Sequence, residues 1–116
     1  MTRPRIAILG AGPTGLEAAL AAAEAGNPFT LYEAASSVAG NVRAWGHVRL
    51  FTPWDMNVSP RMRRHLKTPD GSECPTGRDL AERLFEPIAA LPEVAPNLRL
   101  GVRVLSVGRQ GLLKHE

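Results

Sequence analysis

Residues 10–15, GAGPTG, decide how the rest of this 116-residue sequence is interpreted. The glycines stand at positions 10, 12 and 15, which is the G-x-G-x-x-G spacing of nucleotide-binding turns. Because glycine is common, three fixed positions recur by chance, and the flanking sequence must decide. A nucleotide cradle needs a strand before the glycines and a helix after them.

The flanking residues predict both of these elements. Residues 5–9, RIAIL, form a short apolar run that ends at glycine, which is typical of a strand buried on both faces. Residues 13–26 have apolar side chains at helical spacing, with Pro13 suited to the first turn and Gly26 to the helix end. Residues 29–33, FTLYE, predict a second strand. Together these segments predict a βαβ unit with a right-handed crossover.

Each glycine has its own role in this interpretation. Gly10 permits a tight turn, Gly12 lets the backbone approach a pyrophosphate, and Gly15 lets the helix pack closely. The helix N–H groups and dipole would face the phosphates. Glu33, 18 positions beyond Gly15, could accept hydrogen bonds from both hydroxyls of a ribose and would repel a 2′-phosphate. The pattern therefore predicts a nucleotide site that disfavours NADP, with a plain turn and a surface glutamate as the alternative.

Composition and charge favour one globular domain. Apolar residues make up 44% and charged residues 22% of the chain, close to globular averages. No apolar run approaches the ~18 residues that span a bilayer, so no membrane association is expected. Cys74 is the only cysteine, which excludes an internal disulfide and makes a cytoplasmic location the default expectation.

The net charge is +3, and the densest basic patch is residues 61–67, RMRRHLK. No aromatic residue is interleaved there, and no helix-turn-helix or zinc-finger spacing lies nearby. We therefore expect a solvated helix face and no nucleic-acid partner, with contact to phosphate as the alternative. The histidines His47, His65 and His115 lack metal-ligand spacing, so no metal is predicted.

Residues 34–75 predict a loop-rich insertion without strong periodicity up to about Ser59. Its large side chains could cover a ligand or anchor the connection on the core. They are Trp45, His47, Phe51 and Trp54. Ser59 and Pro60 predict the start of a short helix through residue 66.

Two further elements follow the insertion. Thr76 and Asp79 form a capping-box pattern that predicts a helix to about Leu91. Its apolar stripe consists of Leu80, Leu84, Ile88 and Leu91. Residues 97–108 alternate apolar and polar side chains, with Leu98, Leu100, Val102 and Val104 on one face, and predict a third strand. The fold class predicted is α/β, with an incomplete Rossmann-type parallel sheet.

Residues 5–40 resemble the N-terminal FAD-binding segment of flavoprotein oxidoreductases with two dinucleotide-binding domains, such as flavin-containing monooxygenases and thioredoxin reductase-like enzymes. The resemblance is carried by IAILGAGPTGLEAALAAAEAG and FTLYEAASSVAG, with Pro13 inside the fingerprint and the small Ala19 after it. These flavoproteins have a Gly-Gly pair where this chain has Ala39 and Gly40.

The resemblance implies an FAD-dependent oxidoreductase whose flavin takes hydride from NAD(P)H and passes electrons to oxygen or a small organic substrate. It implies diphosphate contacts from Gly10, Gly12, Pro13, Thr14 and Gly15. It also implies a ribose contact from Glu33, and contacts along the cofactor from Val42 and Arg43. NAD(P)H would bind outside this segment, and no residue is singled out as catalytic.

Flavoproteins of this group continue with an antiparallel meander, a Gly-Asp segment at the flavin and a second nucleotide domain. We therefore expect residues 1–116 to be an FAD/NAD(P)-binding Rossmann-type domain, the N-terminal part of a larger flavoprotein. A stand-alone NAD-binding module and a non-catalytic truncated fragment are the alternatives.

Overall fold

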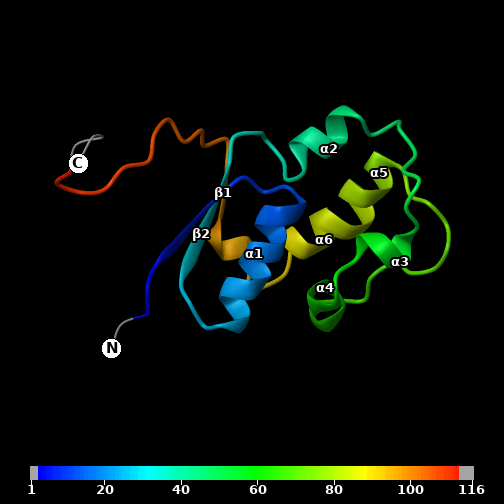
Figure 1. The fold of residues 1–116 in the computed structure, drawn as a ribbon, viewed down its shortest axis with the longest axis horizontal. Coiled ribbons are helices and arrows are strands. Elements are labelled where there is room, and N and C mark those ends of the chain that lie inside the picture. The colour runs from blue at the N-terminus through cyan, green and yellow to red at the C-terminus, as the bar shows by residue number, and fades with distance from the viewer. Residues whose placement is uncertain (1–2, 113–116) are drawn as a thin grey trace.

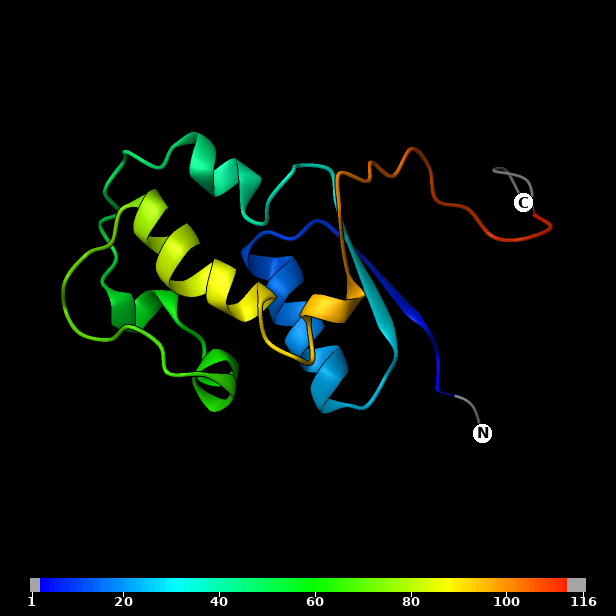
Figure 2. The same ribbon diagram turned by 180° about the vertical axis from the view of Figure 1, so that it is seen from behind.

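The computed structural model describes residues 3–112, which form a parallel sheet with helices gathered on one side (Figures 1 and 2). The three strands are β1 (Ile6–Leu9), β2 (Phe29–Glu33) and β3 (Leu98–Leu100), in the spatial order β1-β2-β3. All neighbours are parallel, with Ile6 beside Phe29 and Leu31 beside Leu98. The predicted α/β Rossmann-type fold is confirmed.

Helix α1 (Pro13–Glu24) connects β1 to β2 and completes the predicted βαβ unit. Leu16, Ala19 and Leu20 are fully buried on its inner face. At its end the Arg3 guanidinium donates to the carbonyl of Ala25 over 2.6 Å. The apolar spacing and the flanking Pro13 therefore predicted this helix correctly.

Three short helices follow β2: α2 (Gly40–Ala44), α3 (Trp54–Asn57) and α4 (Pro60–His65). The sequence predicted α4, whose cap Ser59 accepts a hydrogen bond from the Met62 N–H. It did not predict α2 or α3, because helices of five and four residues are too short for an apolar period to become visible.

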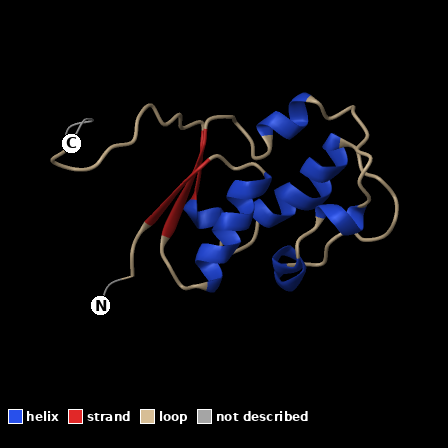
Figure 3. Ribbon diagram, viewed as in Figure 1, coloured by secondary structure: helices blue, strands red, loops and turns tan. Residues whose placement is uncertain are grey.

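The predicted helix after Thr76 forms as three joined segments, α5 (Gly77–Leu80), the π-helical η1 (Ala81–Phe85) and α6 (Glu86–Ala89), which Figure 3 shows as one rod. The predicted capping box of Thr76 and Asp79 is present. Pro87 has no N–H to donate to the Arg83 carbonyl, and the turn before it widens, so that the Glu86 N–H reaches the Ala81 carbonyl. A 3₁₀ turn, η2 (Ala95–Asn97), then leads into β3.

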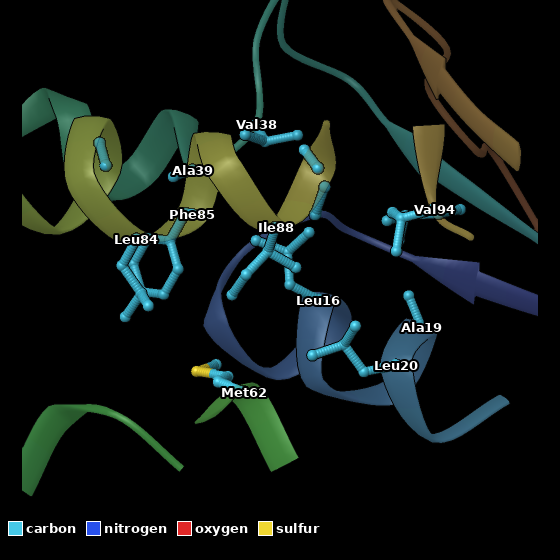
Figure 4. Close-up of a cluster of buried hydrophobic side chains, with 14 of the residues drawn as sticks. Leu16, Ala19, Leu20, Val38, Ala39, Met62, Leu84, Phe85, Ile88 and Val94 are labelled. Atoms are coloured by element: carbon cyan, nitrogen blue, oxygen red, sulfur yellow. The ribbon is translucent and has the colours of Figure 1, made fainter. Parts of the chain in front are cut away.

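The core lies between α1 and this rod (Figure 4). Leu16 and Leu20 of α1 face Leu84 and Ile88, and Val94 closes the cluster beside the sheet. All five side chains are fully buried. This packing holds the start of α1 at one end of the sheet.

The prediction that β1 is buried on both faces was wrong. Ile6 and Ile8 are partly buried against the helices, whereas Ala7 and Leu9 are exposed. Leu9 has 51% of its surface accessible to solvent. The reason is that the helices cover one face of the sheet only (Figure 3). The continuous apolar run of β1 could not distinguish one covered face from two.

The predicted third strand is shorter than expected. Gly101 has a φ of +69°, and the strand ends at Leu100, although the Val102 N–H still donates to the Glu33 carbonyl over 3.0 Å. Val104 is exposed in the extended segment that follows (Figure 1). Apolar alternation alone did not reveal this end, because a strand also needs a partner along its whole length.

Among residues 3–112, no helix combines the length and the apolar character needed to cross a bilayer.

Candidate functional site

The glycine-rich turn between β1 and α1 is shaped by two of its three glycines. Gly10 has a φ of +102°, a conformation that strongly favours glycine, and its N–H donates to the Tyr32 carbonyl. A Cβ at Gly15 would overlap the carbonyl oxygen of Gly10. The turn and the close approach expected of these two positions are therefore present.

Gly12 differs from its neighbours because its missing side chain faces open space. A Cβ placed there would meet no atom within 4 Å. Gly12 is the residue before α1, and no side chain within residues 3–112 caps this helix start. The first-turn N–H groups and the positive end of the helix dipole therefore lie beside an opening that suits an anion.

This opening is part of a cavity of about 560 Å³. Five of the predicted site residues line it: Gly10, Gly12, Pro13, Glu33 and Val42. Residues that the sequence analysis did not assign to the site complete the wall: Ala34, Ala35, Ala39, Gly40, Asn41 and Arg103. The structure thus brings together the glycine turn, the end of β2 and the start of α2 around one space.

Glu33 ties the turn to the sheet in addition to lining the cavity. One carboxylate oxygen accepts from the Ala11 N–H over 2.8 Å, and the other accepts from the Ala35 N–H over 2.8 Å. A carboxylate has further lone pairs, so these bonds leave acceptor capacity for ribose hydroxyls. Sequence reasoning missed this bracing role, because it depends on contacts with backbone atoms.

Ala39 stands where the resembling flavoproteins have the first glycine of their pair. It is buried and has a φ of +59°, in the left-handed region that strains a residue with a Cβ. Its N–H donates to the Ala11 carbonyl over 2.9 Å, which fastens the start of α2 to the glycine turn. The backbone geometry expected of a glycine is therefore retained with alanine.

Thr14, Gly15 and Arg43 are not among the residues that line this cavity. Thr14 borders a neighbouring hollow of about 470 Å³ that shares Pro13 with it, and Gly15 packs beneath the turn. The Arg43 side chain donates to the Val38 carbonyl over 3.1 Å and lies 3.4 Å from the Glu86 carboxylate. The cofactor contacts of all eight residues, those that line the cavity included, stay predictions.

A further cavity of about 360 Å³ adjoins the first at the carboxyl ends of β1 and β2. The two cavities share Gly10, Ala34 and Arg103. Arg103 could have been found from the strand order. In a parallel sheet the residues that follow β3 lie at the same edge as the glycine turn that follows β1.

The basic stretch 61–67 has intramolecular partners. Glu24 of α1 lies 3.1 Å from Arg61, 2.9 Å from Arg64 and 3.1 Å from His65 of α4. The other ring nitrogen of His65 lies 2.9 Å from Glu93. The hydrogen bond with Arg64, followed by that with His65, lowers the pKa of Glu24 to about 2. Arg63, Arg64 and Lys67 are exposed, as expected of a solvated helix face. The partners of this stretch, which the sequence did not predict, also hold α4 against α1.

The large side chains of the insertion have different environments. Trp54 is buried, with the Arg83 guanidinium 5.0 Å from its ring centre, so it anchors the segment on the helical rod. The ring of Trp45 packs against Gly77, where an added Cβ would come within 2.7 Å of it. Phe51 is 96% exposed. Within residues 3–112, no group of three histidine, cysteine or carboxylate side chains gathers as a metal site would require.

Solved structures share this fold. S-allyl-L-cysteine S-oxygenase from Allium sativum is 20% identical, with a TM-score of 0.73 over 96% of this chain and 30% of that one. A flavin monooxygenase from Stenotrophomonas maltophilia is 21% identical, with a TM-score of 0.72 over 96% of this chain and 32% of that one. An oxidized steroid monooxygenase bound to NADP is 20% identical, with a TM-score of 0.63 over 87% of this chain and 20% of that one.

The chain thus spans between a fifth and a third of the length of these proteins. The comparison with curated proteins found no match. The model of the NAD(P)-binding Rossmann-like domain family matches residues 8–67, which include the end of β1, the glycine turn, α1, β2 and Glu33. The chain therefore belongs to the NAD(P)-binding Rossmann-like domain family.

Proposed function

We propose that this chain is the FAD-binding portion of a flavin-dependent oxidoreductase. The observation that carries the proposal is the cavity at the start of α1, where Gly12 leaves open space and Glu33 stands at the end of β2. The family match and the shared fold with flavin monooxygenases support it.

The residues present fit the adenosine-diphosphate half of such a cofactor. A Cβ at Gly12 would enter the space beside the first turn of α1, so glycine leaves room there for a diphosphate. The helix dipole favours the negative charge, and the Glu33 carboxylate can accept from ribose hydroxyls. Val42 adds an apolar side chain on the wall formed by α2.

The bound flavin would supply the electron transfer, taking hydride from NAD(P)H bound outside these residues and passing electrons to oxygen or a small organic substrate. The residues of this chain would hold and orient the nucleotide. Glu33 would serve in two ways. Its bonds to the Ala11 and Ala35 N–H groups keep the turn in place, and its carboxylate lines the cavity with acceptor capacity to spare.

NAD is the second candidate ligand, because the matching family is described as NAD(P)-binding and the adenosine diphosphate is common to NAD and FAD. The test is the visible absorbance of the purified chain, before and after FAD is added, with NAD in competition. We expect a bound flavin spectrum that NAD does not displace. Displacement by NAD would favour a stand-alone NAD-binding module, and binding of neither would favour a non-catalytic fragment.

Turnover is tested separately by following NADH and NADPH oxidation in the presence of FAD. A chain that binds FAD without oxidising either donor would place the donor site in another polypeptide segment. The binding part of the proposal would then stand, and the catalytic part would apply only to the longer protein.

A further inference from the structure

Arg103 is held at the nucleotide cavity by two backbone hydrogen bonds at the carboxyl end of β2. The Gly101 N–H donates to the Ala35 carbonyl over 2.9 Å, and the Val102 N–H donates to the Glu33 carbonyl over 3.0 Å. These bonds fix the chain immediately before Arg103, at the edge where β2 ends. None of the ion pairs formed within residues 3–112 involves Arg103.

Arg103 also stands on the boundary between two cavities of different character. The larger one contains the Glu33 carboxylate and the open space at Gly12. The smaller one has Leu9, Tyr32 and several valine and leucine side chains in its walls. A ligand that spans both would place a sugar at Glu33 and a flatter, less polar group in the smaller cavity.

Resting on the proposed function, we propose that Arg103 is a further binding residue that stacks its guanidinium on the purine base of the bound nucleotide. A guanidinium is planar, stays charged and interacts favourably with aromatic faces. Glu33 stands at the same end of the larger cavity and repels a second anionic group, so an unphosphorylated ribose suits the site. Arg103 thereby holds the base, while Glu33 selects the sugar.

The test uses the full chain and calorimetric titration with ADP and, separately, with inorganic pyrophosphate. Arg103→Leu should raise the Kd for ADP about 3- to 20-fold, the range of a cation–π contact, and leave that for pyrophosphate unchanged. Arg109→Leu is the matched control, because it removes the same charge from an exposed position of the same segment. It should bind both ligands as the wild type does.

Two replacements separate stacking from charge. Arg103→Trp should keep most of the affinity for ADP, because an indole stacks on a base, whereas Arg103→Lys should recover less of it. The reverse order, or an equal loss of pyrophosphate affinity in Arg103→Leu, would overturn the proposal in favour of a phosphate contact.

The proposed function and the role of Arg103 can fail separately. If the wild type binds ADP and Arg103→Leu binds it equally well, the role of Arg103 is overturned and nucleotide binding stands. If the wild type binds neither ADP nor FAD, both are overturned. Because Arg103 is exposed, its variants should keep the wild-type thermal midpoint, which excludes misfolding as a cause of lost affinity.

Discussion

The two ends of α1 differ in how their charges and polar groups are satisfied. At its start, backbone N–H groups and small residues border an open cavity beside Gly12. At its end, Glu24 would face the negative pole of the helix dipole unfavourably, and Arg61, Arg64 and His65 of α4 compensate for it. The first end is open to an external anion, whereas the second has its charges matched inside the molecule. Substitutions at the two ends should therefore have different consequences.

The largest loss of stability is expected for Gly15→Val. Its Cβ would overlap the Gly10 carbonyl oxygen, which cannot move without opening the turn between β1 and α1. We expect the free energy of unfolding to fall by about 3 kcal/mol or more, to be measured by urea denaturation. A loss below about 0.5 kcal/mol, the range of neutral surface changes, would contradict the close packing described for this turn.

Gly12→Val should instead abolish binding while leaving the fold intact. The new side chain meets open space in the protein but occupies the position proposed for the diphosphate. The Kd for ADP should rise by about 100-fold or more, equivalent to ~2.7 kcal/mol, in the same calorimetric titration. Normal binding by a folded Gly12→Val variant would discredit the glycine fingerprint as a nucleotide site.

Glu33→Ala should affect stability and binding together. It leaves the Ala11 and Ala35 N–H groups without their acceptor, and we expect a loss of about 1–3 kcal/mol in the free energy of unfolding. The Kd for ADP should also rise. A variant that loses affinity at wild-type stability would show that Glu33 serves the ligand and not the turn.

The far end of α1 should respond to pH. A neutral imidazole has one N–H donor, so only a protonated His65 can donate to both Glu93 and Glu24. The pKa of His65 is raised from 6.5, chiefly by Glu93, so its contribution is complete below pH 6.5 and is lost as pH rises through the raised value. The pKa of Glu24 is lowered from 4.5 to about 2, so its contribution is lost as pH falls through that range.

The contribution of Glu24 and His65 to the thermal midpoint should therefore be largest between about pH 4.5 and 6.5. His65→Asn should remove the part of the decline above pH 6.5 that belongs to the imidazole. If the thermal midpoints of the wild type and this variant change with pH in parallel, the pairing of His65 with Glu24 and Glu93 does not contribute to stability.

The smallest effect is expected for Ala39→Gly. It removes the strain of a Cβ at a φ of +59° but also removes a buried methyl group and makes the unfolded chain more flexible. These effects oppose one another, and we expect a change within about 1 kcal/mol of zero in the free energy of unfolding. Ala39→Val should destabilise by more than this, because β-branching is incompatible with that conformation.

The start of α1 could be predicted from the sequence because its signals are local. Gly10, Gly12, Gly15 and Glu33 stand at fixed spacing around a helix with a clear apolar period. Arg103 could not be assigned in the same way, because its place depends on where a distant third strand pairs with β2.

The far end of α1 was predicted less well for the same reason. A cluster of basic residues at 61–67 is typical of a solvated helix face, and nothing in its own sequence names Glu24 and Glu93 as partners. Local patterns therefore predicted the start of α1, which is formed by backbone groups close together in the sequence. The contacts at its far end join side chains that are distant in the sequence, so they could be identified only from the structure.

The most direct test is an amide NMR titration of the full chain with ADP. We predict chemical-shift changes at the N–H groups of Gly10, Gly12 and Ala35, with those of Arg64 and His65 unchanged. Shifts confined to Arg64 and His65 would place the anion on α4 and contradict a nucleotide site at the start of α1.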